Sequence, residues 1–303
     1  MLGIGQVVKN AFRLGTVIPA FNVPYLPMIK PIIQAVADLD SFALVETARI
    51  EWLRFECHSA EAVMQEFAKW DRPGHVRLHL DHIPVIDESG SRVDYSTIVQ
   101  EAIDLGYHSV MVDGSSLDLA ENTRATREVV AQAHAAGIPC EAELGAILRE
   151  GGEAPLSYED LFESGAGFTK VEQAALFVAG TGCDWLSVAI GNIHGALSAV
   201  VKDKGKTEAR LSLELLDRLR QATAIPLVLH GGSGVRREDV LAAIEHGIAK
   251  VNIGFEIRSA YEISLRESGG DSAKAQDSVY QRTCWLISEY FNVAGNRRLV
   301  AGD

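Results

Sequence analysis

The sequence predicts an α/β protein with a (β/α)₈ TIM barrel, built as a single domain with a C-terminal helical extension. Short apolar, β-branched runs recur along the chain, and a polar or glycine-containing turn and an amphipathic stretch follow each run. Near-continuous apolar strands that alternate with helices are typical of a parallel sheet covered on both faces. Eight such units favour a closed barrel. A doubly wound sheet is the alternative, because a strand count alone does not prove closure.

The eight expected strands are separated by helical patterns with apolar residues at three- and four-residue spacing. The strands are expected at Val17–Asn22, Phe42–Thr47, Val76–Asp81, Ser109–Gly114, Pro139–Gly145, Trp185–Ile190, Pro226–Gly231 and Lys250–Phe255. The helices are expected at Met28–Leu39, Ser59–Trp70, Thr97–Leu105, Glu121–Ala136, Glu172–Gly180, Leu213–Gln221 and Arg237–His246. A loop at Gly269–Asp271 precedes one long last helix, Ser272–Phe291. We expect one domain over residues 1–303, since no linker or low-complexity segment divides the chain.

The charge balance and the cysteine content restrict the partners and the compartment. The chain has 28 Lys and Arg against 41 Asp and Glu, a net charge of −13, which argues against binding to nucleic acid or to an anionic membrane surface. No apolar stretch approaches the ~20 residues that span a bilayer, and no signal-peptide pattern opens the sequence. The 4 cysteines are scattered without a CxxC pair, so we expect a cytoplasmic protein without a disulfide framework.

Polar residues gather where the expected strands end, which in a barrel is the face that carries the chemistry. His82, His194 and His230 follow the third, sixth and seventh strands. Imidazoles that converge from separate strands are suitable ligands for a catalytic Zn²⁺ or a similar divalent ion. The alternative for any single buried histidine is a hydrogen-bonded core residue.

Strand alternation places one condition on His82. His79 and Asp81 share a face of the third strand, so His82 would point the other way in a regular strand. We therefore expect the strand to have ended by His82, and Pro84 two residues later favours such an end.

Carboxylates accompany these histidines at the strand ends. Asp81 is a candidate general acid/base, because a carboxylate beside a metal can carry a proton to or from a bound hydroxyl. Its alternative role is to orient an imidazole. Asp113 and Glu143 each end an apolar strand, where an unpaired carboxylate is costly. They are interpreted as partners of the metal histidines or, equally, as ordinary buried salt bridges.

A glycine-rich run, Gly231–Gly234, connects the seventh strand to a helix that begins near Arg237. Its backbone N–H groups, the Ser233 hydroxyl and the helix N-terminus favour an anion, and barrels often hold phosphate beside strands seven and eight. Glycine turns are common, so this run alone is weak evidence for an anion site. The histidine that precedes it makes that interpretation stronger.

Taken together, these motifs resemble the class II (zinc-dependent) fructose-bisphosphate aldolase family, most closely its tagatose-bisphosphate aldolase-like branch. The resemblance runs through nearly the whole chain. It rests on the segments Ala20–Asn22, His79–His82, Ser109–Ser115, Glu141–Gly145, Val188–Gly195, Pro226–Gly234 and Ile248–Gly254.

The resemblance implies a Zn²⁺ enzyme that forms homodimers or homotetramers and often binds a monovalent cation as well. It places the metal ligands at His82, His194 and His230, the catalytic aspartate at Asp81, and metal-site carboxylates at Asp113 and Glu143. The positions that contact the substrate are Asn22, Gly195, Gly231, Ser233 and Asn252.

The implied reaction is reversible cleavage of a ketose or ketose phosphate between C3 and C4, which gives dihydroxyacetone (phosphate) and an aldehyde. A metal that chelates the C2 carbonyl stabilises the enediolate left on the ketone half. Asp81 removes the C4 hydroxyl proton in cleavage and returns it in condensation. No Schiff-base lysine is needed.

The chain departs from the family pattern where the phosphate would bind. Phe255 stands where the family usually has Thr, Ala48 stands where it has Ser, and Gly151–Ala154 keeps only part of the mobile-loop pattern. Loss of a hydroxyl donor should weaken a phosphate site by about 1.5–3 kcal/mol. Either the backbone amides of Gly231–Gly234 suffice, or the substrate is a non-bisphosphate or otherwise acidic ketose.

In the second case Arg49, Arg54 or Arg258 is a candidate anion binder, and Glu150 or Glu153 a candidate proton shuttle. Two other classes compete with an aldolase. A metal-dependent epimerase or hydrolase on a similar barrel would use more carboxylate ligands. A non-catalytic barrel subunit would lack the metal ligands or the acid/base, which are all present here.

Overall fold

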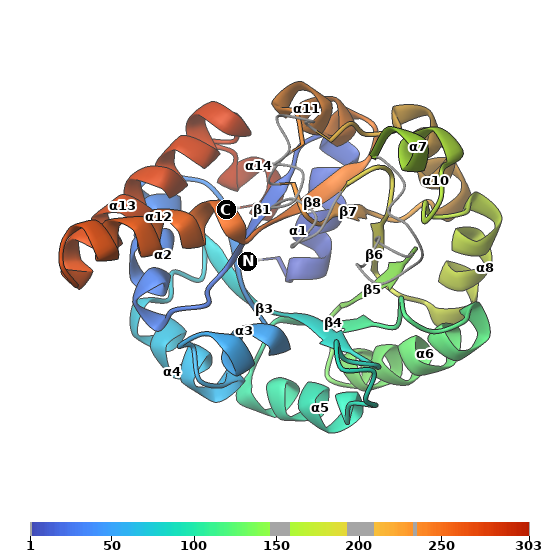
Figure 1. Ribbon diagram of the computed structural model, residues 1–303, viewed down its shortest axis with the longest axis horizontal. Coiled ribbons are helices and arrows are strands. Elements are labelled where there is room, and N and C mark those ends of the chain that lie inside the picture. The colour runs from blue at the N-terminus through green and yellow to red at the C-terminus, as the bar shows by residue number, and fades with distance from the viewer. Residues whose placement is uncertain (1, 146–157, 193–208, 233–234, 303) are drawn as a thin grey trace.

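A closed barrel of eight parallel strands forms the centre of the computed structural model, which describes residues 2–145, 158–192, 209–232 and 235–302. The strands pair in chain order and β1 closes on β8, with the helices in a ring outside (Figure 1). They are β1 Ile18–Asn22, β2 Ala43–Ala48, β3 Val76–Pro84, β4 Ser109–Asp113, β5 Cys140–Leu144, β6 Trp185–Val188, β7 Leu227–Leu229 and β8 Ile248–Ile253. The predicted TIM barrel is confirmed, and the doubly wound sheet is excluded.

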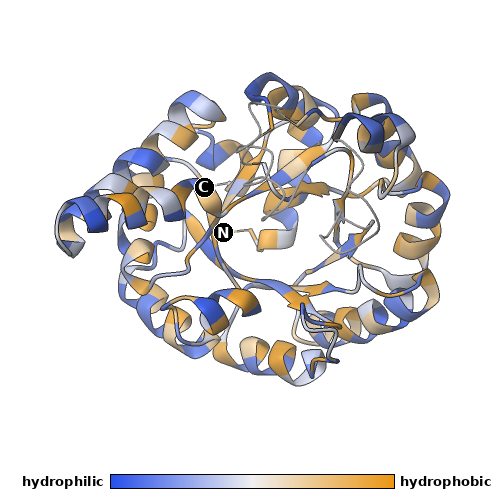
Figure 2. Ribbon diagram, in the orientation of Figure 1, coloured by the Kyte–Doolittle hydropathy of each residue, from blue (hydrophilic) through white to orange (hydrophobic). Residues whose placement is uncertain are grey.

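Helices lie between and after the strands, at the seven places predicted between strands and at several places that were not predicted. They are α1 Ile4–Leu14, η1 Leu26–Met28, α2 Ile29–Asp38, α3 Arg49–Arg54, α4 Ala60–Trp70, α5 Tyr95–Leu105, α6 Leu119–Ala135, α7 Tyr158–Ser164, α8 Val171–Thr181, α10 Leu213–Thr223, α11 Arg237–Glu245, α12 Phe255–Glu267, α13 Ser272–Trp285, η2 Leu286–Tyr290 and α14 Arg297–Ala301. Ser59, Asp94 and Ser212 cap α4, α5 and α10 by accepting backbone N–H bonds. Apolar and polar residues alternate around these helices (Figure 2). Among the described helices, none is long and apolar enough to cross a membrane.

Two predicted boundaries at the C-terminal side were wrong. The last strand ends at Ile253, and Phe255 is the first residue of α12 rather than the end of β8. The tail is not one continuous α-helix, because α13 ends at Trp285 and a single π-helical turn, η2, follows it. The N–H of Phe291 donates to the carbonyl of Leu286 at 2.9 Å, which is the i to i+5 bond of a π turn.

Helix α1 was not foreseen, because the leading segment was examined only as a targeting signal. Ile4, Val7, Val8 and Ala11 follow helical spacing and are buried. They pack in one apolar cluster with strand residues from the N-terminal end of the barrel, and Val300 and Ala301 of α14 join them. The helix therefore closes the barrel at the end opposite the predicted site.

Strand β3 does not end at His82, contrary to the prediction. It continues to Pro84, and its register on β4 shifts so that Leu80 pairs with Val110 and Ile83 with Val112. Asp81 and His82 therefore oppose a single residue, which defines a β-bulge. His82 has a φ of 33°, in the left-handed region that few non-glycine residues adopt. The bulge, rather than a strand end, releases His82 from the alternation.

Candidate active site

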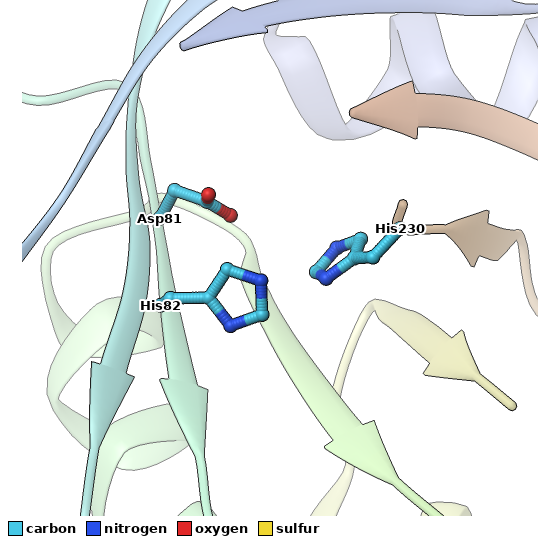
Figure 3. A group of neighbouring side chains, drawn as sticks. All are labelled: Asp81, His82 and His230. Carbon is cyan, nitrogen blue, oxygen red and sulfur yellow. The ribbon is translucent and has the colours of Figure 1, made fainter. Parts of the chain in front are cut away.

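Two of the three predicted metal ligands meet at the C-terminal end of the barrel. His82 comes from the β3 bulge and His230 directly follows β7, and their ring centroids lie 4.5 Å apart. With Asp81 they form a group whose potential ligand atoms lie within 4.8 Å of one another. Figure 3 shows Asp81 and His82 extending from one strand toward His230. The third predicted ligand, His194, lies outside the described residues.

Two carboxylates lie beside these histidines, as the sequence predicted. The Nδ1 atom of His82 is 3.6 Å from Oδ2 of Asp113 on β4 and 3.5 Å from Oε2 of Glu143 on β5. The same Glu143 oxygen is 3.6 Å from Nδ1 of His230. Glu143 thus contacts both imidazoles, and with Asp113 and His82 it forms a second group with metal-ligand spacing.

The chemistry of this cluster fits a divalent cation. Imidazole nitrogens and carboxylate oxygens are ligands that Zn²⁺ takes in catalytic sites. Burial and the charge of Asp113 raise the pKa of Glu143 well above its ordinary value. Burial alone would lower the pKa of His82, but Asp81, Asp113 and Glu143 raise it. A field that holds a proton this firmly also attracts a metal ion in its place.

Asp81 is buried and fixed by two asparagines. Nδ2 of Asn22 on β1 donates to its Oδ2, and Nδ2 of Asn252 on β8 donates to its Oδ1, both at 3.0 Å. Burial would raise the pKa of Asp81, but His82 and Lys250 lower it well below its ordinary value. The two amide hydrogen bonds orient this carboxylate, and its lowered pKa favours the ionised form, which can accept a proton. Asn22 and Asn252, predicted to touch substrate, also orient this carboxylate.

A buried charge cluster under Asp81 escaped the sequence reasoning. Lys250 of β8 lies between Glu46 of β2 and Glu141 of β5, with Nζ to Oε2 distances of 3.1 and 2.9 Å. His79 of β3 is 3.6 Å from Glu141 Oε2, and its pKa is lowered to about 4 by burial and by Lys250. The signal was present in the sequence, because Glu46 and Lys250 interrupt otherwise apolar strands.

Glu51, in α3, is a second missed carboxylate. It is 7% exposed, and its Oε2 accepts the backbone N–H of Ala48 at 2.9 Å. Burial raises its pKa to about 8, although hydrogen bonds to Ala48, Thr47 and Asn22 oppose the shift. Its position after a strand, in a segment of mixed polarity, gave no distinguishing signal. Glu51 thus contacts the asparagine that orients Asp81.

The substrate positions are only partly described. Gly231, with a φ of 67°, and Gly232 follow β7, whereas Gly195, Ser233, Glu150 and Glu153 lie outside the described residues. Gly232 and Asn252 border a cavity of about 130 Å³, whose lining also includes Glu256 and the rings of Trp285 and Tyr290. Phe255 is 42% exposed at the start of α12. The described lining is mostly apolar, and its carboxylate, Glu256, pairs with Arg282 at 3.1 Å.

The three arginines suggested as replacement anion binders differ in their surroundings. Arg49 lies 3.8 Å from Oδ2 of Asp87, and Arg258 lies 3.3 Å from Oε1 of Glu262. The guanidinium of Arg258 also stands 5.6 Å from the centroid of the Phe255 ring. Arg54 is exposed at the end of α3. Arg258 is thus the arginine that contacts the substituted position.

The closed (β/α)₈ barrel carries a cluster of histidines and carboxylates at the C-terminal ends of its strands. This arrangement is typical of TIM-barrel enzymes with a metal site. The family model for class II fructose-bisphosphate aldolase matches residues 3–295, and the chain belongs to that family. It is an enzyme of the aldolase (lyase) type, and zinc is the metal typical of the family.

Individual relatives agree with this assignment. The Escherichia coli K12 protein YdjI is 42% identical over 171 residues, which cover 56% of each chain. The crystal structure of the YdjI aldolase superposes with a TM-score of 0.78 at 30% identity and covers 98% of this chain and 100% of that one. A candidate fructose-1,6-bisphosphate aldolase from Coccidioides immitis gives a TM-score of 0.76 at 28% identity and 96% coverage of both chains.

Proposed function

We propose that this enzyme cleaves a ketose or ketose phosphate reversibly between C3 and C4, giving dihydroxyacetone or its phosphate and an aldehyde. The observation that supports the proposal most directly is the buried Asp81 carboxylate, fixed by two amides beside the His82 and His230 imidazoles. A retro-aldol reaction needs both a base for a hydroxyl proton and positive charge near the developing enediolate.

In this mechanism His82, His230 and His194 would hold a Zn²⁺, with Asp113 and Glu143 beside them. When bound, the ion supplies Lewis-acid charge for the ketone half of the substrate. Asp81 accepts the C4 hydroxyl proton during cleavage and returns it during condensation. Asn22 and Asn252 hold the two carboxylate oxygens, so that Asp81 is aimed before substrate arrives. Gly195, Gly231 and Ser233 are the proposed contacts to the dihydroxyacetone end.

The test is retro-aldol cleavage across a panel of ketose bisphosphates, monophosphates and free ketoses. The Zn²⁺-loaded protein is compared with the same protein after EDTA treatment and with protein reloaded with Zn²⁺. We expect cleavage of at least one ketose, loss after EDTA and recovery on reloading. Absence of cleavage across the whole panel by protein with bound zinc would contradict the proposal.

A specific observation favours a second candidate, the same chemistry on a ketose without the C1 phosphate. Phe255, at the start of α12, stands where the family usually has a hydroxyl donor. If this candidate holds, kcat/KM is higher for free or otherwise acidic ketoses than for bisphosphates in the same panel. A clear preference for a bisphosphate rejects it. A homodimer or homotetramer, a bound monovalent cation and a cytoplasmic location belong to the same proposal.

A further inference from the structure

Lys250 occupies a fully buried position between the strands that carry the site. Lys250, Glu46 and Glu141 are each 0% exposed. The ammonium makes three polar contacts, at 3.1 Å to Glu46 Oε2, 2.9 Å to Glu141 Oε2 and 2.7 Å to Oδ1 of Asn252. The contact to Asn252 is a hydrogen bond, and the two carboxylate contacts are ion pairs. Burying such a charge is costly unless every donor has a partner.

One of these contacts leads to the proposed base. Because Oδ1 of Asn252 accepts from Lys250, the amide must present its Nδ2 to Asp81, where it donates to Oδ1 at 3.0 Å. Without the ammonium, the Asp81 carboxylate would be the one remaining described contact that sets which end of the amide faces it. The reversed amide would point an oxygen at the Asp81 carboxylate and repel it.

Another contact leads to a proposed metal ligand. Lys250 holds one oxygen of Glu141, and the other oxygen lies 2.8 Å from Nε2 of His230. When Glu141 accepts in this contact, the His230 hydrogen is on Nε2, and Nδ1, the atom 3.6 Å from Glu143, carries the lone pair. Carboxylates that fix the tautomer of a ligating imidazole in this way raise its affinity for metal.

We propose that Lys250 is a positioning residue that sets the base and a metal ligand together, through Asn252 to Asp81 and through Glu141 to His230. Its consequence for catalysis rests on the proposed aldolase function. Its consequences for zinc affinity and for the His230 tautomer do not.

The experiment compares Lys250→Met, which keeps the chain length and removes the charge, with the double variant Lys250→Met/Glu46→Gln. The double variant removes one positive and one negative charge, so it is the better candidate to fold. Lys69→Met is the matched control, because Lys69 is exposed and pairs only with Glu66 of its own helix in the described structure. Circular dichroism and thermal unfolding establish folding. Competition with a chromophoric chelator gives zinc affinity, and ¹⁵N NMR of the metal-free protein gives the His230 tautomer.

We expect zinc affinity to fall about 10–100-fold in the Lys250 variants, as for other partners of metal ligands. We also expect a mixture of His230 tautomers, and a kcat that falls much more than KM changes. A residue with a merely structural role lowers the melting temperature and leaves the tautomer and the zinc affinity of the folded protein unchanged. A folded double variant with these two properties intact would overturn the proposal.

The wild-type protein supplies a test that does not depend on folding of a variant. Its metal-free form must show His230 protonated at Nε2, and an Nδ1–H tautomer there overturns the proposal. If zinc affinity and tautomer change as expected but the wild type cleaves no ketose, the positioning role stands and the aldolase proposal fails.

Discussion

The two ends of the barrel solve the problem of filling its interior in opposite ways. At the N-terminal end, Phe42 and Leu44 pack with α1 in an apolar cluster. Toward the C-terminal end the interior holds Glu46, Glu141 and Lys250, all fully buried. Strand β2 contains both solutions, because Leu44 and Glu46 are two residues apart and face the same side.

This difference separates residues that stabilise the fold from residues retained for chemistry. Apolar burial at the N-terminal end of the barrel stabilises the protein by about 25 cal/mol per Å² of surface removed from water. Buried ion pairs toward the C-terminal end contribute little net stability, because the cost of desolvating the charges offsets their attraction. We therefore expect substitutions at the N-terminal end to change unfolding without changing catalysis, and substitutions at the C-terminal end to change catalysis.

The largest expected effect is on catalysis. Asp81→Asn removes the proposed base while keeping its shape, so kcat should fall about 10²–10⁴-fold. Zinc content by mass spectrometry should match that of the wild type, and Asp217→Asn, at an exposed carboxylate paired with His246, is the control. Loss of the metal in Asp81→Asn would instead identify Asp81 as a ligand.

A substitution in the apolar cluster at the N-terminal end of the barrel should change stability and leave catalysis unchanged. Phe42→Ala leaves a cavity under the barrel and should lower the free energy of unfolding by about 3–5 kcal/mol, measured by urea denaturation. The kcat of the folded protein should stay within about twofold of wild type, since Phe42 touches the apolar cluster and not the charged one. Leu176→Ala, at a side chain that is 68% exposed, serves as the control. A large loss of kcat in folded Phe42→Ala would break the separation between the two ends.

The buried carboxyl group of Glu51, near the C-terminal end of the barrel, should reduce the stability of the protein as the pH rises. The pKa of Glu51 is raised from its ordinary 4.5 to about 8, so the folded protein holds the proton more tightly than the unfolded chain. Stability from this group is complete below pH 4.5 and is lost as the pH rises toward 8. Glu51→Gln should therefore stabilise the metal-free protein by about 1–3 kcal/mol at pH 9.

The same substitution should have almost no effect at pH 4.5, where the wild-type carboxyl is already neutral. Urea unfolding at both pH values measures the difference, and Glu61→Gln on the surface of α4 should shift neither curve. A gain that is equal at the two pH values would mean that ionisation of Glu51 is not its cause.

The smallest expected effect concerns the entrance to the site. Phe255→Thr restores a hydroxyl at the start of α12 and should raise kcat/KM about tenfold for ketoses with a C1 phosphate, the lower end of a charge-assisted hydrogen bond. Free ketoses should change little, and Leu299→Thr, at a side chain that is 68% exposed, should change neither class. Equal kcat/KM before and after substitution would show that backbone amides carry the phosphate.

The features that the sequence predicted correctly are those whose signal lies within a single segment of the chain. Apolar periodicity located all eight strands and the seven helices expected between them, because each signal lies within one element, but α3, α7 and α12 were not predicted. Helix α1 carried the same signal at Ile4, Val7, Val8 and Ala11, and could have been found. The strand-end rule brought His82, His230, Asp113 and Glu143 together correctly.

Other features depend on contacts that no single segment contains. The φ of His82 is imposed by the register between β3 and β4, so alternation within β3 gave the wrong strand end. The raised pKa of Glu51 comes from burial against other elements, which its surrounding sequence does not reveal. Lys250 is intermediate, since its charge within a buried strand was visible and its partners were not.

The bulge in β3 also determines which mutations the site tolerates. The proposed base and a proposed ligand are consecutive residues, Asp81 and His82, so covalent geometry fixes their separation. Deleting one residue from this strand would restore the regular pleat and turn one of the two side chains out of the barrel. Point substitutions in the surrounding loops leave the pair intact. Insertions and deletions in β3 should thus abolish the activity. Sugar preference, in contrast, can change through single substitutions at the C-terminal end of the barrel.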